Sequence, residues 1–227
     1  MKTFEELKED LLERAKKHHA CQDGYRMGLN AKSKKDLLEA ITSNLFWVFR
    51  TSKMIDANYL EDNFSEEELS EAGIYTRKEH ASNTRAFACG SATVKAYDSA
   101  TVEAYDSATV KAYDSATVEA YGSATVEAYG SATVKAYGSA TVEAYDSATV
   151  EAYGSATVKA CGSATVEACG SATVEAYGSA TVEAYDNSYV EDCTGNINTV
   201  SDHGIVKDYY NHKIYIKKGK FEIIEIE

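Results

Sequence analysis

The sequence of 227 residues contains no proline, one tryptophan and five cysteines. The absence of proline removes the residue that most strongly interrupts hydrogen-bonded strands, so long backbone ladders are compatible with this chain. An odd number of cysteines argues against the disulfide framework that stabilises small secreted proteins. No run of apolar residues is long enough for a membrane span or a signal peptide. We therefore expect a soluble, cytoplasmic protein with reduced thiols.

Basic residues are outnumbered, because 23 Lys and Arg stand against 36 Asp and Glu, which gives a net charge of −13. Such a chain repels nucleic acid and anionic membranes, so neither is expected as a direct ligand. Proteins with a basic surface are the partners that this charge favours. The sequence also lacks a nucleophile–base constellation, a phosphate loop and a dinucleotide fingerprint. We therefore predict a protein that is not an enzyme and has no catalytic residues or cofactor.

One group of metal-ligating side chains lies near the N-terminus, at His18, His19, Cys21 and Asp23. Their spacing is loose for a zinc site, and no second pair of ligands is evident. These residues are interpreted as the ordinary polar end of a helix, and no metal site is predicted.

What the sequence has in abundance is a repeat, twelve consecutive octapeptides from Gly90 to Tyr185 with the pattern (Gly/Asp)-Ser-Ala-Thr-Val-(Lys/Glu)-Ala-(Tyr/Cys). Positions 2 to 8 alternate as in a strand, with Ser, Thr, Lys/Glu and Tyr on one side and Ala, Val and Ala on the other. The charged side must face water, and the Ala-Val-Ala side must face inward. Position 1 is always Gly or Asp, which adopt a positive φ readily, and this predicts a tight corner.

Identical units with one apolar face bury that face by stacking, which predicts a β-solenoid with about 4.8 Å between coils. Two octads per coil would give a flat coil of two sheets, and three would give a triangular coil. The small interior residues favour two closely packed sheets. The Asp pattern favours three, because Asp98 and Asp114 would be neighbours in a flat coil. Both arrangements stay open at this point.

The flat coil would segregate charge by face. One face would carry five Glu and one Lys, with three Asp at its corners, while Lys and Glu balance on the other. The acidic residues of the first face are Glu103, Glu119, Glu151, Glu167, Glu183, Asp98, Asp114 and Asp146, and the single basic one is Lys135. In a triangular coil, Glu103, Glu127, Glu151 and Glu175 would stack instead. The eight acidic residues of the first face of the flat coil form the candidate partner-binding site. The alternative interpretation is that they form a solvated surface, which keeps a β-protein soluble.

The residues before the array predict a small helical domain over 1–75. A capping box at Thr3–Glu6 begins a helix over 3–20, and a second box lies at Ser65–Glu68. Ser33 has the features of another N-cap. A domain of this size is expected to dock on the first coil as a cap.

Two further features mark the interior of this domain. Gly24 and Gly28 predict a turn between helices, and Ala72-Gly73-Ile74 predicts a helix end terminated by glycine. Residues 45–49, Leu-Phe-Trp-Val-Phe, are the most apolar run of the chain and the expected centre of the domain.

The solenoid is expected over 76–209, with a degenerate coil that begins near Ser82 and two atypical octads after the array. Residues 210–227 predict a hairpin cap, in which strands over 212–216 and 221–226 flank Lys-Lys-Gly-Lys. The predicted fold class is α+β.

An acidic β-solenoid is similar in architecture to the pentapeptide-repeat proteins, whose acidic β-helices act as DNA mimics. The present repeat has eight residues rather than five and no central Leu or Phe, so the likeness is one of shape and charge. His19-Ala20-Cys21-Gln22-Asp23-Gly24 also resembles an Ala-Cys-x-x-Gly helix end found before repeat arrays in gut-bacterial and phage proteins. These resemblances imply an inhibitor from a phage or mobile element that blocks a basic DNA- or RNA-handling enzyme.

Other functions are compatible with the same pattern. The solenoid could be a rigid scaffold or oligomerising spacer, with the helical domain as the partner-binding end. Ice binding, indicated by the Thr rows, is disfavoured by a charge in every strand. The Tyr ladder could stack on bases or sugars, but Cys replaces Tyr in two octads, which favours a structural aromatic stack. Its edges could also pair two molecules into a homodimer.

Overall fold

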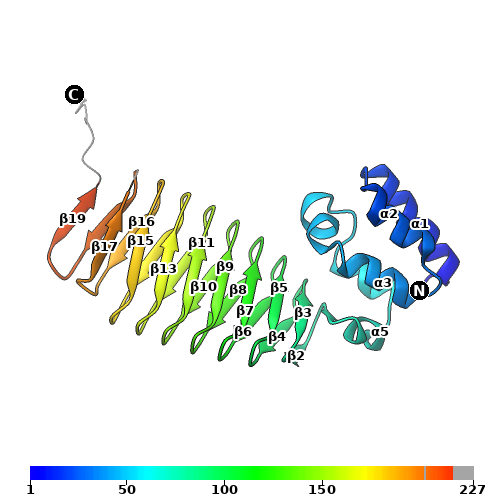
Figure 1. The fold of residues 1–227 in the computed structure, drawn as a ribbon, viewed down its shortest axis with the longest axis horizontal. Helices are drawn as coiled ribbons and strands as arrows, with labels where there is room; N and C mark the ends of the chain where they lie inside the picture. The colour runs from blue at the N-terminus through cyan, green and yellow to red at the C-terminus, as the bar shows by residue number, and fades with distance from the viewer. Residues whose placement is uncertain (202, 217–227) are drawn as a thin grey trace.

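The computed structural model describes residues 1–201 and 203–216. Figure 1 shows a group of helices at one end of a long stack of short strands. This part of the chain comprises six helices, a parallel β-solenoid and a C-terminal antiparallel hairpin, so the α+β prediction is confirmed. None of the helices within it has both the length and the apolar character to cross a membrane.

The helices begin where the caps predict. Thr3 accepts a hydrogen bond from the backbone N–H of Glu6 at 3.4 Å and donates its own N–H to the Glu6 carboxylate at 2.9 Å. Ser65 and Glu68 form the second box, and the Ser33 hydroxyl accepts from Asp36 N at 3.2 Å. The helices are α1 (Phe4–Lys17), α2 (Gln22–Asn30), α3 (Lys34–Thr42), the π-helix η1 (Phe46–Thr51), α4 (Ala57–Asn63) and α5 (Glu66–Glu71).

The turn predicted at Gly24 and Gly28 is wrong, because both glycines lie inside α2. The Cys21 sulfur accepts the N–H of Gly24 at 3.4 Å and caps this helix. A Cβ on Gly24 would lie 3.2 Å from Oδ1 of Asn44. The close approach of the Asn44 side chain, from the turn after α3, therefore favours a small residue at position 24, and no turn lies at Gly24 itself.

The apolar run at 45–49 joins the two parts of the molecule rather than filling only the helical core. Leu45 and Val48 are buried among the helices, but Phe46 is 53% exposed. The Phe46 ring lies edge-on to Tyr121 with centroids 5.9 Å apart, and the Phe49 ring lies 6.0 Å from Tyr105. The helical region thus docks on the solenoid beyond its first coil, where it buries Tyr105 and Tyr121.

Each strand of the solenoid pairs in parallel with the strand two positions along the chain. Val134 in β9, for example, is in register with Val118 and Val150, each 16 residues away. Two octads therefore form one coil, the coil is flat, and odd-numbered and even-numbered strands form separate sheets.

The strands of the array cover positions 4 to 7 of each octad, and those on either side are less regular. The odd-numbered sheet contains β1 (Ile74–Tyr75), β3 (Arg85–Ala88), β5 (Thr101–Ala104), β7 (Thr117–Ala120), β9 (Thr133–Ala136), β11 (Thr149–Ala152), β13 (Thr165–Ala168), β15 (Thr181–Ala184) and β17 (Ile197–Val200). The even-numbered sheet contains β2 (Glu79–Ser82), β4 (Thr93–Ala96), β6 (Thr109–Ala112), β8 (Thr125–Ala128), β10 (Thr141–Ala144), β12 (Thr157–Ala160), β14 (Thr173–Ala176), β16 (Tyr189–Asp192), β18 (Ile205–Asp208) and β19 (Lys213–Ile216).

The core of the solenoid consists almost entirely of Ala and Val. The inward Ala-Val-Ala side chains of the twelve octads are at most 5% exposed. Such small side chains let the two sheets pack closely, which is the physical reason that the flat coil prevails over the triangular one.

The ends of the solenoid differ from the predicted ends. Its first strand is Ile74–Tyr75, earlier than the predicted start near Ser82, because Ile74 follows Gly73 directly and pairs with Phe87. At the other end, β19 lies antiparallel to β18, so the observed hairpin joins 205–208 to 213–216, a pairing that the sequence did not predict. The second strand of the predicted hairpin, 221–226, lies outside the described residues.

The corners have the predicted conformation, since φ at position 1 of the array lies between 55° and 72° for both Asp and Gly. A Cβ on Gly154 would lie 3.1 Å from the carbonyl oxygen of Gly138. The corner Asp146 offsets this strain, because its carboxylate accepts a hydrogen bond from the N–H of Gly130 in the preceding coil at 3.1 Å.

This geometry predicts losses of different size for two substitutions at one corner. Gly154→Ala should lower the free energy of unfolding by about 1–2 kcal/mol, the cost of a positive φ in a residue with a Cβ. Gly154→Asp should cost less, because its carboxylate can accept the N–H of Gly138. Urea unfolding of both variants measures the difference, and equal losses would contradict the role assigned to the carboxylate.

Candidate functional site

The five Glu residues of the candidate site lie in one column on the outer face of the odd-numbered sheet. Glu103 is in register with Glu119, and Glu151 is in register with Glu167, which is followed by Glu183. We call these five residues the acidic column. Neighbouring members in register are one coil apart, about 4.8 Å.

Basic side chains neutralise part of the acidic column. Arg85 forms an ion pair with Glu103 at 2.9 Å, and Lys135 lies between Glu119 and Glu151 and pairs with Glu151 at 3.0 Å. Within residues 1–201 and 203–216, Glu119, Glu167 and Glu183 form no ion pair with Lys or Arg. The negative charge of the column is therefore concentrated at these three positions.

Tyr side chains hold the carboxylates in place. In seven of the eight octads with Glu at position 6, the Tyr two residues later donates its hydroxyl hydrogen to that Glu. The bond from Tyr121 to Glu119 measures 2.6 Å, as does that from Tyr185 to Glu183. In the eighth octad the Cys169 thiol lies 3.8 Å from Glu167. Seven of the eight carboxylates are thus held by a Tyr hydroxyl, and Glu167 has only a long contact with a thiol.

The Tyr residues are themselves fixed by stacking along the two edges of the solenoid. On one edge the rings of Tyr97, Tyr113, Tyr129 and Tyr145 stack with centroids 5.0–5.2 Å apart and interplanar angles of 7–10°. Cys161 lies on this edge and Cys169 on the other, because consecutive octads belong to opposite sheets. The two stacks thus position the Tyr hydroxyls as far as Tyr145 and Tyr153, where a Cys interrupts each stack. Tyr185, which donates to Glu183, lies beyond this interruption.

The three Asp residues of the candidate site line one edge, at the corners that precede odd-numbered strands. Asp114 accepts a hydrogen bond from the N–H of Asp98 at 3.4 Å, and Asp146 accepts one from Gly130 at 3.1 Å. Two of the three carboxylates therefore stabilise the preceding corner while they stay exposed. They add negative charge beside the acidic column without belonging to it.

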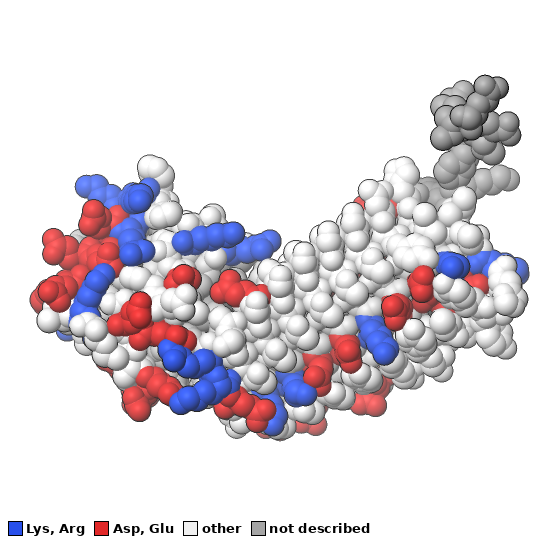
Figure 2. Space-filling model, turned by 180° about the vertical axis from the view of Figure 1, so that it is seen from behind, with Lys and Arg blue, Asp and Glu red and all other residues white. Residues whose placement is uncertain are grey.

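The opposite face has a different charge pattern. On the even-numbered sheet Lys95 pairs with Glu79 at 2.7 Å, and Lys111 pairs with Glu127 at 2.9 Å. Figure 2 shows acidic and basic side chains sharing one row along the face of the solenoid in view, with uncharged side chains above the row. Charge on the solenoid is thus confined to narrow rows, and the edges are uncharged except at the Asp corners.

The flat coil, one of the two alternatives that the sequence left open, places the five Glu residues on one sheet, as the structure does. Two features of the column were missed. The Tyr–Glu pairs were present as the tripeptide Glu-Ala-Tyr, whose first and third side chains share one side of a strand. The ion pair of Arg85 with Glu103 is diagonal, because Thr101 is in register with Arg85 and Phe87 with Glu103, and strand register alone does not indicate it.

The Tyr–Glu pairs predict a loss of stability in alkali. Hydrogen bonds to Glu127, Glu143 and Glu183 raise the pKa of Tyr129, Tyr145 and Tyr185 to about 12. The unfolded value is about 10, so the folded chain holds more protons between these two pH values. The contribution is fully present below about pH 10 and is lost as the pH rises from 10 to 12. Urea unfolding across this interval tests the loss.

A direct control is the absorbance of tyrosinate during alkaline titration. Glu183→Gln removes the charge that raises the pKa of Tyr185, so one Tyr should titrate at lower pH in this variant. An unchanged titration curve would show that the hydrogen bond does not control the pKa.

Comparison of the chain with known protein families, curated proteins and solved structures finds no match. The geometry of the acidic column and of the helical region is therefore the basis for the function proposed below.

Proposed function

We propose that this protein is a non-enzymatic binding protein whose acidic column docks on the basic groove of a DNA- or RNA-handling enzyme and blocks it. The observation that carries the proposal is the column of Glu carboxylates in register on one sheet. Three of them have no ion pair with Lys or Arg in the described residues. Glu119 and Glu183 accept a Tyr hydroxyl, whereas Glu167 lies beside the Cys169 thiol. A basic groove that binds a phosphate backbone presents cations to such a row.

The spacing of the column supports this proposal. Carboxylates at about 4.8 Å per coil compare with about one phosphate per 3.4 Å of helix axis on each DNA strand. The column is less densely charged than DNA, and the Asp edge beside it partly makes up the difference. Long-range attraction between opposite charges speeds encounter with a basic partner.

The fixed positions of the carboxylates on the sheet also support the proposed docking. Stacked Tyr rings and Tyr–Glu hydrogen bonds hold the charges in place, so little side-chain entropy is lost when a partner binds. The likeness to pentapeptide-repeat DNA mimics stays one of shape and charge, because no residue of that family has an equivalent here. An inhibitor encoded by a phage or mobile element fits this activity.

The test uses purified DNA-handling enzymes, namely a topoisomerase, a restriction endonuclease and an RNA polymerase. The full-length protein should inhibit at least one of them, and excess duplex DNA and added salt should both relieve the inhibition. Glu119, Glu167 and Glu183 replaced together by Gln should weaken inhibition at least about tenfold.

The matched control replaces Glu143, Glu175 and Glu191 on the opposite sheet by Gln, with the same change in net charge. This variant should inhibit as the unmodified protein does. Equal losses in both triple variants would show that net charge matters rather than the column. Unchanged inhibition in both would favour the alternative function, in which the solenoid is a scaffold and the helical domain binds the partner.

A further inference from the structure

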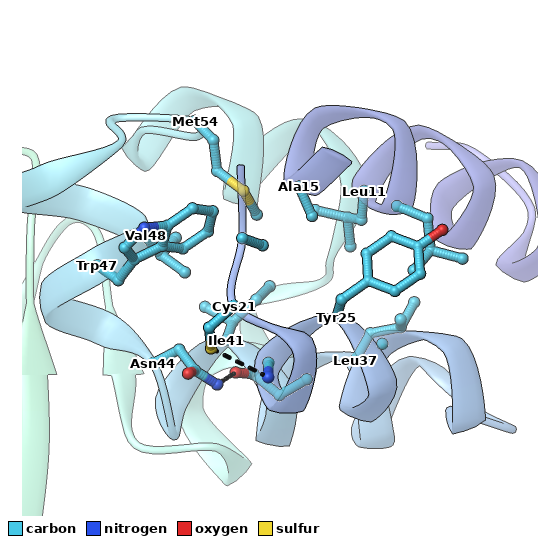
Figure 3. Close-up of a pocket in the computed structure, with 15 residues that line it drawn as sticks. Leu11, Ala15, Cys21, Tyr25, Leu37, Ile41, Asn44, Trp47, Val48 and Met54 are labelled. Atoms are coloured by element: carbon cyan, nitrogen blue, oxygen red, sulfur yellow. Dashed lines mark hydrogen bonds between the residues drawn. The ribbon is translucent and has the colours of Figure 1, made fainter. Parts of the chain in front are cut away.

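The helical region contains a pocket of about 160 Å³ that the acidic column does not use. Figure 3 shows the pocket between α1, α2, α3 and η1. Its walls include Leu11 and Ala15 from α1, Tyr25 from α2, Ile41 from α3, Trp47 from η1 and Met54 from the loop that follows. The pocket is partly open to solvent although its lining is mostly apolar, and an unfilled apolar hollow among helices is a candidate binding site.

The pocket stays unfilled because several of the side chains that line it are small. Five of the fifteen lining residues are Ala or Gly, and they belong to the helices and loops on its several sides. Gly28 is one of them, and a Cβ added there would meet only Leu12, at an ordinary contact distance of 3.4 Å. Larger side chains would therefore fit at Gly28, and neither backbone conformation nor crowding requires a glycine.

The chemistry of the walls defines what could occupy the pocket. None of the fifteen lining residues is charged, and the polar side-chain groups are the Asn44 amide, the Cys21 thiol, the Tyr25 hydroxyl and the Trp47 indole N–H. Most of the surface is aliphatic or aromatic, with the Trp47 indole and the Met54 thioether on one side (Figure 3). Burying a charged group here would be costly, whereas an uncharged ring would replace water with apolar contacts.

The volume defines the size of the occupant. An apolar cavity of about 150 Å³ accommodates a benzene ring in a protein core. The backbone beside Trp47 also departs from a regular helix, since η1 is a π-helix in which Ser52 N–H donates to Trp47 O at 2.8 Å. Such widened turns are frequent at functional sites.

We propose that this pocket is a binding site for a small uncharged aromatic molecule of about one ring. The site is separate from the acidic column, and its occupant would bind whether or not the column docks on an enzyme. Trp47 is the only tryptophan of the chain, so it reports occupancy directly.

The experiment titrates the full-length protein with toluene while the fluorescence of Trp47 is recorded. We expect a saturable change with a dissociation constant on the order of 0.1 mM, which is near the affinity open to a ligand of so few atoms. Benzoate has the same ring with a negative charge and serves as the matched ligand, and it should produce no saturable change. The absence of saturation with toluene, or equal binding of benzoate, would overturn the proposal.

Two variants at one position locate the site. Gly28→Leu fills the pocket and should weaken toluene binding at least about tenfold, whereas Gly28→Ala adds one methyl group and should leave binding within about twofold. Circular dichroism shows whether both variants fold. Methyl NMR of the unmodified protein gives an independent measure, because toluene should shift the methyl signals of Ala15 and Met54 but not those of Val142 or Val158. Shifts confined to the solenoid would overturn the assignment.

Discussion

Replacing Val134 with Asp is expected to unfold the central coils of the solenoid. Val134 is 0% exposed, and its neighbours in register are Val118 and Val150. A carboxylate at this point would have no water, and the backbone N–H groups around it are used in the strand ladder. Burying a charge without a partner costs more than about 4 kcal/mol. Because each coil rests only on its neighbours, the damage should spread along the stack in both directions.

A second substitution in the same strand, Ala136→Asp in β9, provides the control for this prediction. Asp occupies the inward position 7 in β16, where Asp192 is 3% exposed and accepts the N–H of Thr194 at 2.7 Å. Position 7 adjoins a corner, so a carboxylate there can accept a hydrogen bond from a backbone N–H of the corner. A carboxylate at position 5, in the middle of the strand, cannot reach such a donor. Ala136→Asp should therefore cost less than Val134→Asp. Urea unfolding followed by circular dichroism measures both, and an equal loss in the two variants would contradict this explanation.

The coil count shows what a repeat does and does not reveal. The alternation of Ala and Val with polar residues is the same whether two or three octads form a coil, so it predicts strands and corners but not the cross-section. The neighbouring Asp98 and Asp114 were an argument against the flat coil. In the structure the Asp114 carboxylate accepts the N–H of Asp98, and this hydrogen bond offsets the repulsion between the two charges.

In the helical region, too, features with local causes were predicted and features with tertiary causes were not. The caps at Thr3, Ser33 and Ser65 depend on residues three positions apart, and the sequence predicted all of them. Gly24 and the pocket depend on tertiary contacts within the helical region. The run at 45–49 depends on Tyr rings much later in the chain, Tyr121 for Phe46 and Tyr105 for Phe49. No local pattern carries such information.

The candidate site was predictable as a set of residues but not as an electrostatic surface. The column of Glu on one sheet follows from the octad order once the coil is flat. Which carboxylates are neutralised by an ion pair depends on contacts between coils, such as that of Lys135 with Glu151. Hydrogen bonding by Lys135, and then by Tyr153, lowers the pKa of Glu151 and keeps it ionised in that pair.

Deleting a single octad, residues 138–145, is expected to abolish inhibition of a DNA-handling enzyme, whereas deleting two, residues 138–153, should preserve it. A deletion of one octad moves every later strand to the opposite sheet, because strands alternate between sheets. Glu151, Glu167 and Glu183 would leave the acidic column, and Lys159, Glu175 and Glu191 would take their places. A deletion of two octads removes one whole coil, including Glu151, and returns later strands to their own sheet. Glu167 and Glu183 then stay in the column, with Lys135 in register with Glu167.

The two deletion variants should be equally stable, so a difference in their inhibition can be assigned to the order of charges on the sheet. All octads share the same inward Ala-Val-Ala residues, so any octad can stack on any other, and a solenoid tolerates the loss of units. Both variants should therefore retain the circular dichroism spectrum of stacked strands. Inhibition should fall at least about tenfold in the first and stay within about twofold in the second. If the two inhibit equally, the order of charges along the sheet is not what the partner recognises, and the acidic column has no part in binding.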